Sequence, residues 1–304
     1  MPTDTVQIQP LARPPDADVI VPGSKSYTNR ALLVSAMASG TSRLSGALFS
    51  DDTRYMSETL RQLGVNVVAD EAAARFTVTG TGGIIPVSGA ELYVGNSGTT
   101  CRSIISYVAH GRGRFVIDGD APMRQTRPIS DLLDALTQLG VDARSQNDNG
   151  CLPVVIQADG FAGGRTRLDA SKSSQFLTAL MLTGPGTAAG LEIEITGDLK
   201  TGYIDITMDV MRAFNAEVTH DDYRSFAVPG GQRYAARNYA IEPDASSASY
   251  FFAAAALSGG RIRVGNLGVD SVQADLGFIE VLEQMGCHVT RSASSIEVIG
   301  PRSL

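Results

Sequence analysis

The spacing of apolar residues predicts amphipathic helices that recur along the chain. Before the first of four related turns, Met56, Leu60 and Leu63 fall on one helical face. A Gly or Asn follows each helix, where a left-handed residue commonly ends a helix, and a strand-like stretch comes next. The turns, at intervals of 76, 75 and 71 residues, are RQLGVNV (Arg61–Val67), TQLGVDA (Thr137–Ala143), RAFNAEV (Arg212–Val218) and EQMGCHV (Glu283–Val289). The chain therefore contains four copies of one repeat.

Each copy also opens in the same way. A Gly/Ser/Thr-rich segment leads into an apolar helix at residues 23–40, 95–111, 170–186 and 244–260, and a β-type stretch and a second helix follow. Alternating helices and short strands indicate an α/β or α+β architecture built by repetition. Because the period is too long for a thin solenoid, we expect closed globes of several copies.

Two interruptions mark candidate domain boundaries. The first lies near Val19–Val21, and the second is a Gly/Arg/Tyr-rich link at Gly230–Tyr239 before the fourth copy. A strand-like segment at Val6–Arg13 precedes the first copy, so we expect it to pair elsewhere in the fold.

Composition excludes several classes of protein. The 304 residues, 43% of them hydrophobic, suffice for roughly two globular domains. The longest apolar run, Tyr250–Leu257, is far shorter than the ~20 residues that span a bilayer, so no membrane partner is expected. A formal charge of −7 argues against nucleic-acid binding. Three cysteines without a CxxC pair, and no secretory signal in the first residues, favour a reducing, cytoplasmic location.

Small hydroxyl residues and cations gather where the apolar helices begin. The free N–H groups and positive dipole end of a helix favour an anion there. The first copy supplies Ser24, Lys25, Ser26 and Arg30, the second supplies Asn96, Ser97, Gly98, Thr99, Thr100 and Arg102, followed by Arg124 and Arg127, and the third supplies Ser171, Lys172, Ser173, Ser174 and Gln175. If three copies close on one axis, these helix starts converge, and a phosphorylated or carboxylated metabolite is the natural ligand.

A simpler interpretation applies to each helix start taken singly. Ser, Thr, Asn and Asp are ordinary helix caps, and a single surface Lys or Arg is usually solvated. Asp51 or Asp52 is expected to cap the second helix of the first copy. His110, His220 and His288 lack the spacing of metal ligands, so no metal site is predicted.

Several long motifs, in order, resemble the 5-enolpyruvylshikimate-3-phosphate (EPSP) synthase branch of the enolpyruvyl transferase family. They are PGSKSYTNRALL, SDDTRYM, GNSGTTCR, RPISDLLDAL, SSQFLTALM, GDLKTGYIDIT and EPDASSASYFFAAAA. The resemblance implies an α/β (α+β) fold of repeated βαβαββ units, which form an inside-out globe with pseudo-threefold symmetry plus an incomplete second globe. It assigns residues 21–239 to a globe that binds shikimate 3-phosphate, and residues 1–20 with 240–304 to the second globe.

The resemblance also implies a reaction, 3-phosphoshikimate 1-carboxyvinyl transfer. The 5-hydroxyl of shikimate 3-phosphate adds to C2 of phosphoenolpyruvate as C3 is protonated, and the adduct then expels phosphate, without a metal or organic cofactor. Lys25 and Arg127 are the implied catalytic residues, both placed at phosphoenolpyruvate. The implied substrate-binding residues are Lys25, Ser26, Arg30, Asn96, Gly98, Arg127, Ser173, Ser174, Gln175 and Tyr203.

Two local departures from the family pattern affect the site. The family often has GDLxSxPY where this chain has GDLKTGY, so Lys200 or Thr201 would replace a phosphate-binding serine. The family commonly has Pro where Ser103 follows Arg102, and changes there loosen binding of the inhibitor glyphosate. We therefore expect reduced glyphosate sensitivity in an intact enzyme that carries Ser103. Comparing inhibition constants for that enzyme and its Ser103→Pro variant tests this, because equal constants would refute it.

The family has six repeat units, and this sequence has four. The resemblance therefore implies that a C-terminal third, with the acid/base residues, is absent from the sequence, and that the second globe exposes apolar surface. One alternative is a chain that binds shikimate 3-phosphate but needs a complementing C-terminal chain for turnover. Another is the sister enzyme that acts on a UDP-sugar, which the SSQF and SGTT motifs disfavour.

Overall fold

Tertiary contacts divide the chain into two units. The computed structural model describes residues 7, 9–10 and 12–302, and each unit is considered by itself. The larger unit is Gly23–Ile241, and the smaller unit combines Met1–Pro22 with Glu242–Leu304.

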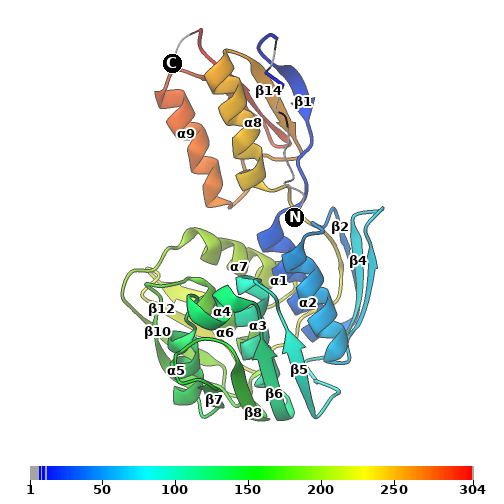
Figure 1. Ribbon diagram of the computed structural model, residues 1–304, viewed down its shortest axis with the longest axis vertical. Helices are drawn as coiled ribbons and strands as arrows, with labels where there is room; N and C mark the ends of the chain where they lie inside the picture. Colours follow the sequence, from blue (N-terminus) through cyan, green and yellow to red (C-terminus); the bar gives the residue numbers. More distant parts are fainter. Residues whose placement is uncertain (1–6, 8, 11, 303–304) are drawn as a thin grey trace. The chain divides into compact units, whose positions relative to one another are not determined.

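The larger unit contains three four-stranded sheets with one strand order (Figure 1). The first copy comprises α1 (Lys25–Met37), β2 (Ser39–Ser45), α2 (Asp51–Gln62), β3 (Asn66–Asp70) and β4 (Arg75–Thr81). The second comprises β5 (Gly89–Tyr93), α3 (Gly98–Val108), β6 (Arg112–Asp118), α4 (Ala121–Gln125), α5 (Ser130–Gln138), β7 (Asp142–Ser145) and β8 (Val154–Asp159). The third comprises β9 (Gly164–Asp169), α6 (Gln175–Thr183), η1 (Gly184–Gly186), β10 (Leu191–Thr196), α7 (Gly202–Ala213), β11 (Thr219–Asp221) and β12 (Ser225–Val228).

Every sheet in this unit begins with a parallel pair and continues with antiparallel strands. In the second sheet, for example, β5 pairs parallel with β6, and β8 and β7 then follow antiparallel. The first sheet takes its leading strand from the far end of the unit, because β13 (Asn238–Ala240) pairs parallel with β2. The segment Gly230–Tyr239 was predicted as a link. Its last residues also belong to β13, the strand that completes the first sheet.

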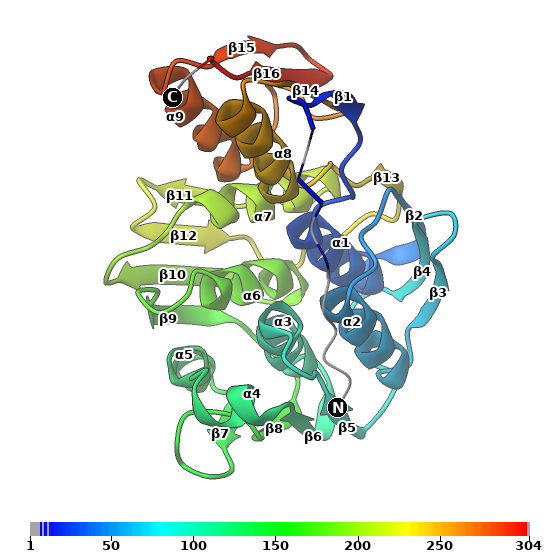
Figure 2. The same cartoon turned by 45° about the horizontal axis from the view of Figure 1, so that its top comes forward.

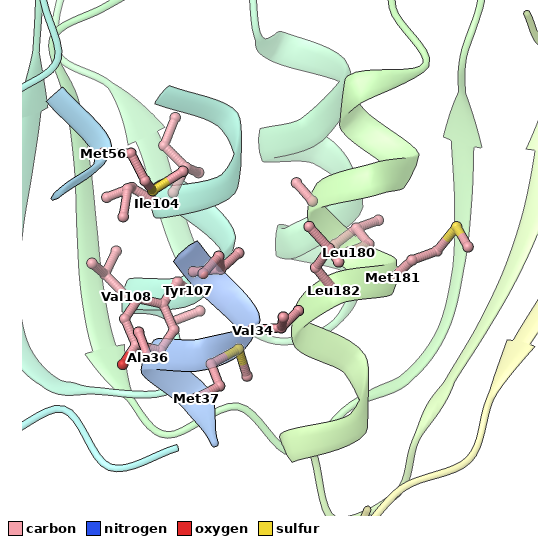
Figure 3. Close-up of a cluster of buried hydrophobic side chains, with 14 of the residues drawn as sticks. Val34, Ala36, Met37, Met56, Ile104, Tyr107, Val108, Leu180, Met181 and Leu182 are labelled. Atoms are coloured by element: carbon pink, nitrogen blue, oxygen red, sulfur yellow. The ribbon is translucent and has the colours of Figure 1, made fainter. Parts of the chain in front are cut away.

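Three apolar helices form the centre of the larger unit. Figure 2 shows α1, α3 and α6 in the middle of this unit, with the sheets around them. All residues of α6 except Gln175 are buried, as are all residues of α3 except Thr99. Figure 3 shows how side chains from these helices meet, among them Val34, Tyr107 and Leu180. Burial of an apolar helix on every side, with sheets outside, gives the inside-out α/β globe that the family resemblance implies.

The smaller unit repeats the same arrangement once. Its described elements are β1 (Asp16–Val19), α8 (Ala245–Ser258), β14 (Arg261–Gly265), η2 (Ala274–Leu276), α9 (Gly277–Gln284), β15 (His288–Arg291) and β16 (Ser295–Ile299). The sheet order is β1-β14-β16-β15, and β1 pairs parallel with β14. Apolar side chains are exposed on α8 and α9, as predicted: Tyr250 is 79% exposed, Leu257 78% and Val281 47%.

The predicted leading strand at Val6–Arg13 is misplaced. Val6, Ile8 and Leu11 lie outside the described residues, and the described residues of that range are not in a strand. The strand that pairs with the smaller unit is β1, which begins after Pro14 and Pro15. Proline lacks the N–H that a sheet requires, so the strand begins beyond them, although the Pro15 carbonyl accepts from the Arg261 N–H over 2.7 Å.

The predicted cap of α2 is also displaced by one residue. Asp51 and Asp52 are the first residues of the helix, and Ser50 occupies the cap position. The Ser50 N–H donates to Thr53 Oγ1 over 2.9 Å, which satisfies one donor at the helix start. The Asp52 side chain is therefore available for contacts with other elements.

Candidate active site

Helices α3 and α6 run parallel and begin side by side. Near their starts, the Gln175 side-chain amide donates to Thr99 Oγ1 over 3.3 Å. Near their ends, Ser106 Oγ and Thr183 Oγ1 are 2.6 Å apart. The second and third copies therefore present their helix N-termini at one end of the larger unit.

Helix α1 has the same direction. In its second turn, Arg30 Nη2 donates to Thr178 Oγ1 of α6 over 3.4 Å. At its other end, Met37 lies beside the segment that follows α6, because a Cβ added to Gly186 would be 3.4 Å from Met37 Cε. All three central helices thus begin at one end, as predicted, and their unpaired N–H groups and positive dipole ends favour an anion there.

Lys25, the first residue of α1, connects the first copy to the second. Lys25 Nζ lies 3.6 Å from Asp52 Oδ2, and the Lys25 side chain is 48% exposed. The Asp52 carboxylate also accepts from Ser97 Oγ over 2.7 Å, and the Asp52 carbonyl accepts from Thr100 Oγ1 over 3.0 Å. Asp52 therefore links the half-exposed Lys25 ammonium of the first copy to the start of α3 in the second.

Arg30 is buried and connects three helices. Its Nε donates to Thr207 Oγ1 over 2.9 Å, its Nη1 to the Ser26 carbonyl over 2.9 Å, and its Nη2 to the Tyr203 carbonyl over 3.0 Å. Burial lowers the pKa of Arg30 to about 10, so the guanidinium remains charged at neutral pH. With the bond to α6, four of the five N–H donors of the guanidinium have acceptors in the described part of the chain, and one N–H of Nη1 has none there.

Arg127 and Arg102 flank the start of α3. Arg127 Nη1 donates to the carbonyl and the side-chain oxygen of Asn96, over 2.7 and 2.9 Å. Arg102 Nη1 donates to the Gly98 carbonyl over 2.9 Å, and the guanidinium lies 5.4 Å from the centre of the Phe176 ring. Burial, and in addition the charge of Arg127, lower the pKa of Arg102. These two cations lie close enough to act on one anion.

A cavity of about 460 Å³ opens beside these cations. The residues that line it are Arg102, Thr126, Arg127, Pro128, Lys172, Ser173, Gln175 and Phe176. Lys172 is held by Asp131, since its Nζ lies 2.9 Å from Asp131 Oδ2. Ser173 Oγ accepts from the Gln175 N–H over 3.2 Å, so its own proton can be donated to a ligand oxygen. The cavity is thus suited to an anion with several oxygen atoms.

The predicted site residues fall into adjoining groups at this end of the unit. Arg127, Ser173 and Gln175 line one cavity, and Asn96 and Gly98 adjoin it through Arg127 and Arg102. Ser174 is the residue before α6, and its carbonyl accepts from the Thr178 N–H over 3.1 Å. A second group joins Ser26 and Tyr203 through Arg30, and Tyr203 is 43% exposed. Lys25 is connected to the first group through Asp52 and Ser97.

Two residues at this end were not among the predicted site residues. Arg102 was noted only as the residue after the helix start, although it lies four residues after Gly98 and therefore on the same helical face. Asp52 was interpreted as a cap, and its contact with Lys25 joins residues 27 positions apart, which no local pattern reveals. No group of His, Cys, Asp or Glu suited to a metal occurs among the described residues.

The sequence of this chain matches a known protein family over nearly its whole length. The family model "EPSP synthase (3-phosphoshikimate 1-carboxyvinyltransferase)" matches residues 12–304. The chain belongs to the EPSP synthase family. It is therefore a transferase of the shikimate pathway, and the substrates of its family are shikimate 3-phosphate and phosphoenolpyruvate.

Individual relatives cover nearly the whole chain. The 3-phosphoshikimate 1-carboxyvinyltransferase of Nostoc sp. (strain PCC 7120) is 46% identical over 302 residues, which are 99% of this chain and 71% of the relative. That of Salmonella heidelberg (strain SL476) is 41% identical over 290 residues, 94% of this chain and 67% of the relative. A solved structure of EPSP synthase from Acinetobacter baumannii matches with a TM-score of 0.81 at 26% identity, covering 94% of this chain and 64% of the solved one.

No helix in the described ranges has both the length and the hydropathy needed to cross a bilayer.

Proposed function

We propose that this chain binds shikimate 3-phosphate and phosphoenolpyruvate where α1, α3 and α6 begin, and takes part there in the transfer of the enolpyruvyl group to the 5-hydroxyl of shikimate 3-phosphate. The observation that carries the proposal is the parallel arrangement of three buried helices whose starts meet beside Lys25, Arg127 and Ser173. Fixed donors and cations of this kind stabilise anionic groups without reorganising during reaction. The larger unit, Gly23–Ile241, is then the globe that binds shikimate 3-phosphate.

Each group has a distinct task in this proposal. Ser173 donates its free proton to the phosphate of shikimate 3-phosphate, next to Ser174 and Gln175 at the start of α6. Arg30 offers its remaining N–H to the same substrate, beside Ser26 and Tyr203. On the other side, Lys25 and Arg127 pair with the anionic groups of phosphoenolpyruvate, because a planar guanidinium matches a carboxylate or phosphate. Bound in this way, the 5-hydroxyl and C2 of phosphoenolpyruvate are held together, which lowers the entropic cost of their reaction.

The alternative function is binding without turnover, in which a complementing C-terminal chain is the further partner. Calorimetric titration of the 304-residue chain with shikimate 3-phosphate, followed by a phosphate-release assay after phosphoenolpyruvate is added, distinguishes the two. Binding with steady phosphate release supports the full reaction. Binding without release favours the alternative, and absence of binding overturns both. The cytoplasmic location inferred from the cysteines remains a prediction.

Replacing Lys25 with Ala should lower the affinity for phosphoenolpyruvate at least tenfold in the presence of saturating shikimate 3-phosphate. A hydrogen bond from a charged group to an anion contributes about 1.5–3 kcal/mol, and the Lys25–Asp52 pair is too exposed to affect folding strongly. Calorimetric titration of both proteins measures the change. Arg165→Ala, which removes an 83%-exposed cation elsewhere in the larger unit, is the control and should bind as the wild type does. Equal affinities for Lys25→Ala and Arg165→Ala would remove Lys25 from the site.

A further inference from the structure

Arg102, in the second turn of α3, is a buried cation with few partners inside the protein. The residue is 6% exposed, and no carboxylate in the described part of the chain is close enough to pair with it. Its one hydrogen bond to the described residues runs from Nη1 to the Gly98 carbonyl, while its Nε is buried without an acceptor. Arg30 is 3% exposed, yet four of its five N–H donors have acceptors. Arg102 therefore keeps donors that the surrounding protein does not use.

The charge of Arg102 destabilises the fold unless an anion compensates it, because burial removes the cation from water. Burial lowers the pKa of Arg102, and the charge of Arg127 adds to this effect. A guanidinium nevertheless keeps its proton at neutral pH, so loss of the proton does not relieve the cost. The Phe176 ring, whose centre lies 5.4 Å from the guanidinium, attracts the cation less strongly than an anion does. An anionic ligand is therefore the partner that suits this side chain.

Arg102 and Arg127 converge on one point at the start of α3. A Cβ built on Gly98 would lie 2.4 Å from Arg102 Nη1 and 2.7 Å from Arg127 Nη2. Two guanidinium nitrogens so close to one point can donate to the oxygen atoms of a single carboxylate or phosphate group. The N–H groups of Gly98 and Thr99, the first two residues of the helix, also have no acceptor among the described residues. Because the two like charges repel each other, an anion that both contact stabilises the pair.

The guanidinium of Arg102 reaches the cavity between the starts of α3 and α6. Of its nitrogens, only Nε is both buried and without an acceptor in the described ranges. Nη2 has no acceptor there either, so it must reach accessible surface. Because Arg102 lines the cavity together with Arg127 and Phe176, that surface belongs to the cavity. An anion in the cavity can therefore contact both arginines directly.

We propose that Arg102 is a second substrate-binding arginine, which with Arg127 holds one anionic group of phosphoenolpyruvate at the start of α3, and that its burial lowers the stability of the substrate-free protein. The inference rests on the proposed function, because it adds a residue to the phosphoenolpyruvate site. The bound anion is the counter-ion that the fold does not supply. Arg102 is thus retained for binding, and its packing in the core is a cost of that role.

Replacing Arg102 with Met tests the effect on stability. Methionine occupies a similar space without a charge, so the thermal unfolding midpoint of the larger unit should rise by about 2 °C or more in zwitterionic buffer of low ionic strength. Arg102→Lys, which keeps the charge, should show no such rise, and neither should Arg165→Met, which removes an exposed arginine. A purely structural role predicts a lower midpoint, because the contacts with Gly98 and Phe176 are lost. A midpoint that does not rise in Arg102→Met, or failure of this variant to fold, overturns the proposal.

Calorimetric titration of the same variants tests the effect on binding. At saturating shikimate 3-phosphate, Arg102→Met should weaken phosphoenolpyruvate binding about tenfold or more, whereas Arg165→Met should bind as the wild type does. Affinity for shikimate 3-phosphate alone should change less than about threefold, because a group that contacts only the other substrate is removed. An equal loss for both substrates would overturn the assignment to phosphoenolpyruvate, and so would unchanged binding.

A double-mutant cycle tests whether the two arginines hold the same group. The loss in Arg102→Met/Arg127→Met should be about fivefold or more below the product of the two single losses, because residues that share one partner are not independent. A combined loss equal to that product would mean that Arg102 and Arg127 bind separately, which contradicts the proposal.

Failure of the proposed function has a different signature. If the wild type binds no phosphoenolpyruvate, inorganic phosphate still tests the arginine pair, because an anion that binds only the folded state raises the unfolding midpoint. Phosphate should raise the midpoint of the wild type and of Arg165→Met by equal amounts, and that of Arg102→Met by less. This result would support the anion site although the proposed function had failed. Equal rises in all three proteins, or no rise in any of them, would overturn the anion site itself.

Discussion

Replacing Arg30 with Ala should lower the free energy of unfolding of the larger unit by about 3 kcal/mol and abolish measurable binding of shikimate 3-phosphate. The change removes the hydrogen bonds of the guanidinium to Thr207, Thr178 and the carbonyls of Ser26 and Tyr203 and opens a void between α1, α6 and α7, and each hydrogen bond from a charged group contributes about 1.5–3 kcal/mol. It also removes a buried positive charge from the proposed substrate site. Urea unfolding followed by circular dichroism measures the first effect, and calorimetric titration measures the second.

Two controls separate these effects. Arg165→Ala removes an arginine whose side chain is 83% exposed, so its unfolding midpoint should remain close to that of the wild type. Shikimate 3-phosphate should raise the midpoint of the wild type and of Arg165→Ala, because a ligand that binds only the folded state stabilises it. The proposal that Arg30 acts in both roles fails if Arg30→Ala is as stable as Arg165→Ala or is stabilised by shikimate 3-phosphate to the same degree.

Local patterns were sufficient to predict the repeat and its helices. The residues predicted to end the helices before the four turns all have positive φ: 90° at Gly64, 83° at Gly140, 68° at Asn215 and 93° at Gly286. These features depend on neighbouring residues alone, through helix periodicity and the conformations that Gly and Asn tolerate. A single sequence therefore contains the information needed to find them.

Strand membership depends on distant partners and was predicted less well. Strand β1 is defined by its pairing with Arg261–Val264, about 245 positions later, and Arg261 also forms ion pairs with Asp16 and Asp18. Strand β13 is defined by its pairing with Arg43–Ser45 in the first copy. Such short strands have no periodicity of their own, so their place is decided by the sheet edge that each one meets.

The candidate site also combines features that local patterns predict with contacts that depend on distant residues. The hydroxyl residues and cations at the helix starts were found because recurrence in three copies distinguishes them from ordinary caps. The parallel direction of the helices brings these starts together, as the closure argument predicted. The sequence did not reveal that Asp52 contacts Lys25, or that Asp131 holds Lys172, because both contacts join separate elements. Such contacts determine which cations remain available to a ligand.

Replacing Gly98 with Ala should weaken phosphoenolpyruvate binding at least tenfold while the fold is retained. Gly98 is the first residue of α3, and a Cβ built there would lie 2.4 Å from Arg102 Nη1 and 2.7 Å from Arg127 Nη2. Both are the ends of flexible side chains, so the helix can persist, but Arg127 must leave its position beside Asn96. Loss of one well-oriented charged contact corresponds to about 1.5–3 kcal/mol. Titration with phosphoenolpyruvate at saturating shikimate 3-phosphate measures the loss.

Gly277→Ala is the matched control for this substitution. Gly277 is also the first residue of a helix, α9, but a Cβ built there has no heavy atom within 4 Å among the described neighbours. Both variants therefore change helix propensity equally, and only Gly98→Ala displaces arginines. Affinity for shikimate 3-phosphate should change less than threefold in both, because Ser173 and Arg30 lie away from the added methyl group. Equal phosphoenolpyruvate affinity in the two variants would show that the position of Arg127 does not matter. A loss confined to Gly98→Ala would establish that the absence of a side chain at this helix start is what lets two arginines act on one anion.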